Sequence, residues 1–406
     1  MALADAARAA LAYRGGMTAP WQPGSWQPVP WQPAPWQPHG WVPQYSWDPA
    51  HGWVPRWVWH PQYGWVHEHQ WGPLPHPPPV WQQPSRRYTR TPHPRPTPYL
   101  HLLRTRSYGW WKSLLGLPFS VLVWLAGALV LGLIVGLLAF AGGAEDILDD
   151  LATDPLATPS TLLVTNLVLA LLIPAVWVTL LVVHQERLGW VSSVVRRLRW
   201  RLLAGFGVLA TALLGLGLAL GLALPGGSAE GVPDPDRSTG FVVGMILAVL
   251  FTTPLQAAGE EYFFRGYLSQ VIAGWIPARA VGALVAGLVT GVLFAVAHGQ
   301  QSPAAFISRL VFGFTASLVV WLTGGLEAAI AYHVMNNVLL FLLDLLLGPG
   351  VLVETSGALV LLVDLTVMAA FVGAVAWWSR SRKPQRLSAP GGDAAPAYPA
   401  QALQRA

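Results

Sequence analysis

The chain has 406 residues, of which 53% are hydrophobic and only 11% are charged, and its formal net charge is +5. Long apolar stretches with so few charges indicate a polytopic membrane protein rather than a set of soluble domains. There is no cysteine, which excludes disulfides, thiolate metal ligands and a cysteine nucleophile. The arginines cluster beside apolar segments and form no separate basic domain, so we expect no nucleic-acid partner.

The first hundred residues are rich in tryptophan and proline. Trp-Gln-Pro recurs at Trp21, Trp26, Trp31 and Trp36, and then gives way to a mixture of proline, histidine and tryptophan. Dense proline removes backbone donors and favours extended geometry, so we predict a disordered cytoplasmic tail over residues 1–100. The tail is either a low-complexity tether or a ladder of indole rings for lipid headgroups or an unidentified partner. We expect no cleaved signal peptide at the start, where Met17 is an alternative to Met1.

Eight apolar segments follow, and most are long enough to cross a hydrocarbon core of about 30 Å. They are Leu117–Ala141, Thr161–Val183, Leu202–Leu224, Phe241–Ile272, Ala280–Ala297, Phe306–Leu322, Ala328–Leu347 and Ala358–Trp378. We therefore predict an all-α membrane bundle of about eight transmembrane helices over residues 101–378, followed by a short basic tail at 379–406. Glycines four residues apart predict close helix packing within the chain, at Gly132/Gly136, Gly217/Gly221 and Gly287/Gly291.

The arginines predict the orientation of the helices, because short loops rich in positive charge stay in the cytoplasm. Basic clusters precede the first segment, separate the second from the third, and follow the eighth, whereas the opposite loops carry aspartate and glutamate. Both termini are therefore predicted to face the cytoplasm. This placement agrees with an even number of spans.

Two acids and an arginine interrupt the fourth apolar segment, at Glu260, Glu261 and Arg265. A charge at the bilayer centre costs roughly 2.5–3.5 kcal/mol on insertion scales, so such groups are paired or functional. Glu261 and Arg265 lie four residues apart in the order that favours an ion pair. Glu260 points about a third of a turn away, which leaves a second carboxylate available for chemistry. A purely structural ion pair is the alternative interpretation.

Two histidines occur beyond His184, and both lie in or at the end of apolar segments. His298 ends the fifth segment, while His333 lies in the seventh, one helical turn before Asn337. Considered alone, His298 could be a core or interfacial histidine, and His333 with Asn337 could form hydrogen bonds between helices. The joint occurrence of these groups with Glu260 favours a reactive site.

Hydrolysis by an activated water is the chemistry that these residue types support. A carboxylate in a low-dielectric surrounding can take a proton from water, and histidine and asparagine donors can stabilise an oxyanion. The sequence contains no Gly-x-Ser-x-Gly elbow and no His-Glu-x-x-His zinc motif.

Three motifs occur in order on separate apolar helices. They are Glu-Glu-x-x-x-Arg from Glu260, Phe-x-x-x-His from Phe294 and His-x-x-x-Asn from His333. Together they resemble the CPBP family, which contains the CAAX proteases and bacteriocin-processing enzymes and is also called the Abi family. The similarity covers about residues 241–347, which form the CPBP-like core of the predicted membrane domain.

The resemblance implies a role for each matching position. Glu260 corresponds to the base that activates water, and Glu261 with Arg265 organises it. His298 is expected to help position the water or the transition state, and His333 with Asn337 is expected to form the oxyanion site. The Trp/Pro tail has no counterpart in the family pattern.

A metal remains an alternative, because family members are often described as metalloproteases. Glu260, His298 and His333 would then form a zinc set with one open position for water. The pair of histidines on one helical turn that usually binds zinc is absent, so we expect no cofactor and a metal-free glutamate mechanism.

The sequence thus predicts an endopeptidase of the bacterial plasma membrane that cleaves a peptide or a membrane-anchored protein near the bilayer. Scarce lysine beside abundant arginine, alanine and glycine is the compositional basis for a bacterial source. The alternative class is a non-enzymatic transporter, scaffold or bacteriocin-immunity protein that uses the charged cluster for pairing.

Overall fold

The computed structural model describes residues 93–388, with gaps at 94–95, 106–107, 145, 225–236 and 349–357. It also describes the backbone of six short strands between residues 42 and 70. The chain divides into two compact units, Met1–Arg86 and Arg87–Ala406. The Trp-Gln-Pro repeats, the two candidate start residues and residues 389–406 lie outside the described residues.

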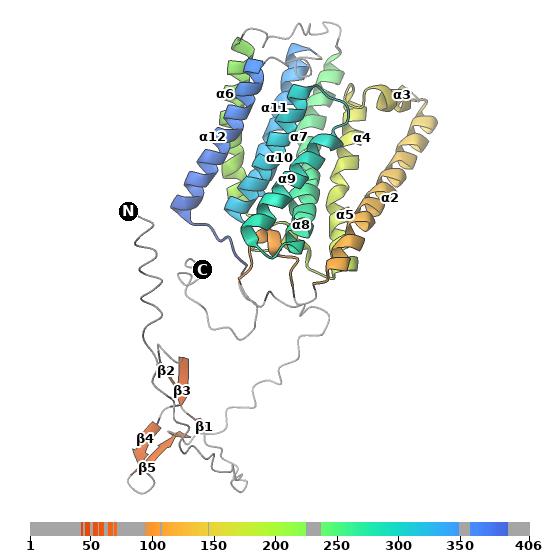
Figure 1. The fold of residues 1–406 in the computed structure, drawn as a ribbon. Coiled ribbons are helices and arrows are strands. Elements are labelled where there is room, and N and C mark those ends of the chain that lie inside the picture. Colours follow the sequence, from red (N-terminus) through yellow and green to blue (C-terminus); the bar gives the residue numbers. More distant parts are fainter. Residues whose placement is uncertain are drawn as a thin grey trace. The chain divides into compact units, whose positions relative to one another are not determined.

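Within its described residues, the second unit is a bundle in which eight helices are long and apolar enough to cross a membrane (Figure 1). The spans are α2 (Trp110–Gly142), α4 to η2 (Pro159–His184), α6 (Trp200–Ala223), α7 to α8 (Thr239–Trp275), α9 (Arg279–Ala297), α10 (Pro303–Thr323), α11 (Glu327–Leu347) and α12 (Ala358–Arg382). The predicted all-α membrane bundle is confirmed. Several helices extend beyond their apolar segments, because polar and tryptophan residues at the interfaces continue the helical turns.

Two of the spans change helical type along their length. The second consists of α4 (Pro159–Ala170), α5 (Leu172–Thr179) and the π-helical turn η2 (Leu180–His184). The fourth consists of α7 (Thr239–Glu261), the π-helical segment η4 (Tyr262–Leu268) and α8 (Ser269–Trp275). π-turns within α-helices are frequent at functional sites, and η4 begins directly after Glu261.

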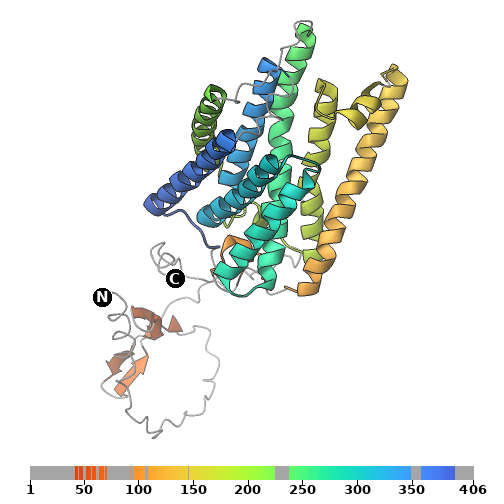
Figure 2. The ribbon, with the colours of Figure 1, turned by 45° about the horizontal axis from the view of Figure 1, so that its top comes forward.

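Helix α7 packs against α4 on one side and α11 on the other (Figures 1 and 2). Its start is fixed by Ser238, whose hydroxyl accepts a hydrogen bond from the backbone N–H of Phe241. At the start of α4, Thr158 and Thr161 form a reciprocal capping box. These caps set the register of the two helices that meet beside the paired acids.

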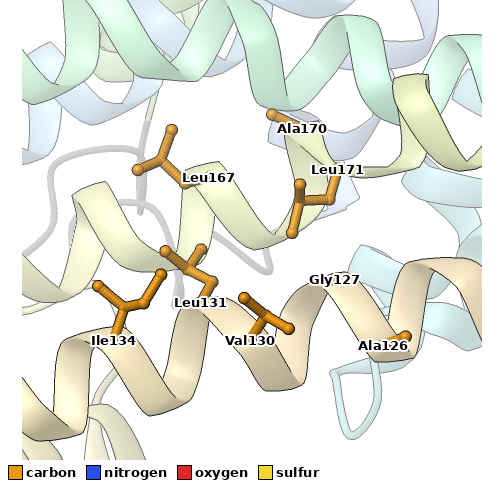
Figure 3. A pocket seen from close by; sticks show the side chains of 8 residues that line it. All are labelled: Ala126, Gly127, Val130, Leu131, Ile134, Leu167, Ala170 and Leu171. Atoms are coloured by element: carbon orange, nitrogen blue, oxygen red, sulfur yellow. The ribbon is translucent and has the colours of Figure 1, made fainter.

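Helix α2 lies at the periphery and buries only Ser113, Gly116, Ser120 and Ala139. Between α2 and the α4–α5 region runs a groove whose lining is apolar and includes Leu131, Ile134, Leu167 and Leu171 (Figure 3). Such a lining suits a surface that faces lipid chains. The short amphipathic helix α3 (Asp146–Thr153) lies between these two spans in the sequence.

Residues 96–105 form a strap across the end of the bundle at which α2 begins and α12 ends. The strap includes the 3-10 turn η1 (Tyr99–His101), and its Tyr99, Leu100 and Leu102 side chains are buried. His101 contacts the backbone oxygen of Ile276 at 3.1 Å, and Arg104 donates a hydrogen bond of 2.7 Å to that of Gly274. The sequence assigned residues up to 100 to the tail, whereas the structure packs the last of them, Tyr99 and Leu100 in η1, against α8.

The segment after α12 also returns to the bundle. Ser388 is buried, and its backbone N–H donates a 2.9 Å hydrogen bond to the oxygen of Thr97. Between η2 and α6, the chain forms the short 3-10 helix η3 (Leu188–Val191). Residues 383–388 therefore belong to the packed unit, although the sequence placed them in a basic tail.

The described part of the first unit contains β1 (Val42–Pro43), β2 (Tyr45–Asp48), β3 (Gly52–Pro55), β4 (Trp57–His60), β5 (Gly64–His67) and β6 (His69–Gln70). They form three separate two-stranded antiparallel sheets, in which Trp47 pairs with Trp53 and Trp59 with Trp65. The pairing follows a repeated Trp-x-Pro-x-x-Gly-Trp-Val pattern at 47–54 and 59–66. Two-stranded sheets are marginal by themselves, so these short strands supply no core of the kind that the bundle has.

The glycine pairs have different surroundings in the folded chain. A Cβ at Gly287 would lie 3.3 Å from Ser317, and one at Gly291 would lie 3.3 Å from the backbone of α10, which confirms close packing there. By contrast, Gly132 and Gly136 have nothing within 4 Å of a built Cβ, because they lie on the part of α2 that faces away from the bundle. Their predicted packing role within the chain was wrong.

Candidate active site

The site is built around the last turn of α7. Gly259 precedes the two acids, and a Cβ at this position would lie 2.4 Å from the backbone oxygen of Leu169 on α4. The absence of a side chain therefore lets α4 approach α7 directly. Glu261 is completely buried and Glu260 is 8% exposed.

Glu261 forms the ion pair that the sequence predicted. Its Oε1 lies 2.8 Å from Nη1 of Arg265, and both side chains are fully buried. The same oxygen lies 2.8 Å from Nδ1 of His333 on α11. One carboxylate oxygen thus holds a cation from its own span and an imidazole from another helix.

Glu260 is placed differently. Its Oε2 lies 3.4 Å from Nε2 of His333, outside hydrogen-bond geometry, and has no hydrogen-bond partner among the described residues. Because Nδ1 of His333 is occupied by Glu261, the imidazole presents Nε2 toward Glu260. The two adjacent acids therefore separate into one that is neutralised and one that can accept a proton.

Aromatic rings close the site on the side of α9 and α10. The Phe294 ring lies 4.3 Å from the guanidinium carbon of Arg265 and 5.7 Å from the ring of His333. Phe312 lies 4.8 Å from the same imidazole and stacks on Phe294 at 5.3 Å. These rings exclude water around Arg265 and strengthen its interaction with Glu261.

His298 stands beside this wall at the end of α9. Its Nδ1 lies 2.8 Å from the backbone oxygen of Phe294, and its ring centre lies 4.7 Å from that of Phe294. No described hydrogen bond or ion pair joins it directly to Glu260. Desolvation and the nearby charge of Arg309 lower the pKa of His298 to about 4, so its ring is neutral at pH 7.

Asn337 joins the site through a residue that the sequence analysis missed. Its Nδ2 donates a 3.1 Å hydrogen bond to Oε1 of Gln256, a buried side chain one helical turn before Glu260 on α7. The Gln256 side chain also interacts with the Glu260 carboxyl group. The sequence signal for this residue was the spacing, because Gln256 is a polar residue in an apolar segment and lies four positions before Glu260.

The structure thus brings Glu260, Glu261, Arg265 and His333 into direct proximity. It connects Asn337 through Gln256 and His298 through Phe294. Within the described residues, no group of three His, Cys, Asp or Glu side chains could hold a metal ion. The set of Glu260, His298 and His333 therefore does not fit a three-ligand zinc site in this arrangement.

These observations define a multi-pass membrane protein with a carboxylate, imidazole and guanidinium cluster buried within its helical bundle. Residues 239–339 match the family model of Rce1-like proteins, described as type II CAAX prenyl endopeptidase Rce1-like. This region of the chain is Rce1-like and contains all six predicted site residues. The CPBP resemblance inferred from the three motifs is thereby confirmed.

One curated relative is the uncharacterized protein YyaK of Bacillus subtilis (strain 168). It is 25% identical over 203 residues, which are 48% of this chain and 64% of the relative. The chain therefore spans less than two thirds of the length of this relative. No solved structure matches the chain.

Proposed function

We propose that the protein is an intramembrane endopeptidase that hydrolyses a peptide bond near the bilayer with a water activated by Glu260. The observation that carries this proposal is the contrast between the two acids. Glu261 is bound to Arg265 and His333, whereas Oε2 of Glu260 faces His333 without a hydrogen bond. A site with only a structural role would need a single paired acid, because an additional buried carboxylate is costly.

In the proposed reaction, Glu260 accepts a proton from water while the water oxygen bonds to the carbonyl carbon of the substrate. The electron pair of the carbonyl moves to its oxygen, and donors that face the site stabilise the resulting charge. In the imidazolium form of His333, whose Nδ1–H is held by Glu261, Nε2–H can donate to this oxygen. The second amide hydrogen of Asn337 is suited to the same role. Glu260 then returns the proton to the leaving nitrogen as the carbon–nitrogen bond breaks.

The ion pair of Glu261 and Arg265 has a positioning role in this scheme. It fixes Nδ1 of His333 and so orients Nε2 toward the reacting groups. The scheme, as we propose it, uses no metal ion.

The substrate class follows from the setting. A site within a helical bundle suits a peptide or a membrane-anchored protein that reaches the bilayer, and the Rce1-like region supports the same class. We place the protein in a bacterial plasma membrane with both termini in the cytoplasm, because its basic clusters gather at one end of the bundle.

The test compares the purified full chain with Glu260→Ala and His333→Ala in a peptide cleavage assay, with thermal unfolding as the folding control. We expect both variants to fold and to lose cleavage, and we expect a strong chelator to leave wild-type cleavage unchanged. Two folded variants with full cleavage would exclude Glu260 and His333 as the reacting groups and would favour a structural role for the charge cluster. Loss of activity with the chelator, restored by zinc, would contradict the metal-free mechanism but not the peptidase function.

A further inference from the structure

Arg309 is a second cation inside a membrane span, and the reaction proposed above does not use it. It lies on α10, two turns after the helix begins, and is half-buried. Phe312 and Gly313 follow it by three and four positions and are buried on the same helical face. Because Phe312 packs on His333 and a Cβ at Gly313 would lie 3.2 Å from Arg265, this face of α10 points at the site.

Within the described residues, no carboxylate forms an ion pair with Arg309. By contrast, Arg199 pairs with Glu327, Arg265 pairs with Glu261, and His333 lies beside both Glu260 and Glu261. The acid that faces the neighbouring Ser308 is Asp364, and the serine donates it a 2.5 Å hydrogen bond. An intramembrane cation without a counter-ion implies a ligand that supplies the negative charge.

The guanidinium is nevertheless held in place. Its Nη1 donates a hydrogen bond to Oε1 of Gln301, and Nε2 of Gln301 donates one of 2.7 Å to the backbone oxygen of Ala295. A neutral amide thus fixes the position of Arg309 but leaves its charge unbalanced. A single amide oxygen also leaves most of the five guanidinium N–H groups available to another acceptor.

The position of Arg309 is at the edge of the reaction site. Its charge acts on His298, and the turn between α9 and α10 beside it is open at Gly299 and Gln300. A hollow lined in part by Gly299, Gln300 and Gln301 lies at this turn. A substrate peptide that reaches Glu260 from this turn would pass the guanidinium first.

We infer that Arg309 binds a carboxylate of the substrate and thereby determines which peptide bond reaches Glu260. This inference rests on the proposed peptidase function. The planar guanidinium matches a carboxylate with two parallel hydrogen bonds. The carboxylate is either the C-terminus of the substrate or an acidic side chain near the cleaved bond, and the chemistry of recognition is the same.

The test uses the full chain in liposomes and three matched peptides that share one cleavage site. One has a free C-terminus and no acidic residue, one has an amidated C-terminus, and one is amidated with a single glutamate near the cleaved bond. We expect wild type to cleave one of the two carboxylate peptides with a kcat/KM at least roughly tenfold above that of the amide. The peptide that is favoured identifies the source of the carboxylate.

Arg309→Gln should remove this preference by lowering kcat/KM for the carboxylate peptide to the value of the amidated one. The readout is the ratio of kcat/KM between the carboxylate peptide and the amidated peptide, which should approach one. Arg309→Lys should retain part of the preference, because it keeps the charge without the planar fork. The matched control is Arg279→Gln, an exposed arginine at the start of α9, which should keep the full wild-type ratio.

An unchanged preference in Arg309→Gln would overturn the inference. An equal loss for all three peptides with a lower unfolding temperature would also overturn it, because it would show a structural role. Activity that depends on anionic lipid through Arg309, without any carboxylate preference, would assign the residue to lipid phosphate instead. Failure of the proposed function is distinct, since Glu260→Ala would then match wild type on every peptide.

Discussion

Nδ1 of His333 lies 2.8 Å from Oε1 of Glu261, an oxygen that also accepts from Arg265. This contact fixes one face of the imidazole and directs Nε2 to Glu260. Glu260 and Glu261 are adjacent in the sequence, but they differ in their contacts: Glu261 binds Arg265 and Nδ1 of His333, whereas Glu260 faces Nε2 of His333. The role of Glu261 in stability and the role of Glu260 in cleavage can therefore be measured separately.

The buried pair of Glu261 and Arg265 should be required for folding. Replacing Arg265 with methionine leaves Glu261 charged and buried without its cation, which should cost about 3–5 kcal/mol of unfolding free energy. Thermal and denaturant unfolding of the purified protein measure this loss. Arg279→Met, at an exposed position, is the control and should unfold like wild type. Equal stability of the two variants would contradict a structural role for the pair.

Gly259 should tolerate no side chain. Gly259→Ala places a Cβ 2.4 Å from the Leu169 oxygen and forces α4 away from α7, which should cost about 1–3 kcal/mol and reduce cleavage. Gly132→Ala is the matched control, because nothing lies within 4 Å of its Cβ. The control should be neutral or up to about 1 kcal/mol more stable through helix propensity. Gly259→Ala should therefore unfold at a lower temperature than Gly132→Ala. Equal unfolding temperatures would contradict the close approach of α4 to α7 at Gly259.

Gln256 and Asn337 should act as one unit beside Glu260. Each alanine variant should lower kcat, and the double variant should lose less than the product of the two single losses. The expected coupling in a double-mutant cycle is about 0.5–3 kcal/mol. Strictly additive effects on kcat/KM would show that the 3.1 Å hydrogen bond between them does not contribute.

The strap should lose stability in mild acid. Burial lowers the pKa of His101 in the strap and of His93 just before it, and the charges of Arg104 and Arg279 lower the pKa of His101 further. Backbone contacts oppose both shifts, and Glu186 opposes that of His93. In each ring, Nδ1 is buried without a hydrogen-bond partner in the described part of the chain. As pH falls below about 6.5, the unfolded strap binds protons that the folded strap excludes, so stability present at higher pH is lost.

The measurement for the strap is the change in unfolding temperature between pH 7.5 and pH 5.5. Wild type should lose stability over this interval, and His101→Gln should lose less of it. The same pH dependence in both proteins would exclude His101 as a contributor.

The helices could be predicted because lipid imposes a strong pattern on sequence. Spans such as α6 and α9 require uninterrupted apolar residues, and their ends fall within a few residues of the predicted limits. The strap could not be predicted in this way. Tyr99 and Leu100 follow a run of proline and arginine, and their burial depends on α8, which is distant in the sequence.

Part of the site could be predicted from the sequence, because charged residues are rare in apolar membrane spans and are usually paired or functional. Glu261 with Arg265 followed from helical spacing, and His333 followed from its motif. The orientation of His298 toward Phe294 depends on how α9 packs against α10, which spacing along one helix does not specify. The link from Gln256 to Asn337 likewise depends on the contact between α7 and α11.

Cleavage by Glu260→Gln is the most direct test of Glu260 as the base. Glutamine keeps the size and hydrogen-bonding capacity of the side chain but cannot accept the proton of water. With folding confirmed by an unchanged unfolding temperature, kcat on a cleaved peptide should fall by about 10²–10⁴-fold. A folded Glu260→Gln protein whose kcat stays within about twofold of wild type would contradict the account, because one general base contributes far more than that.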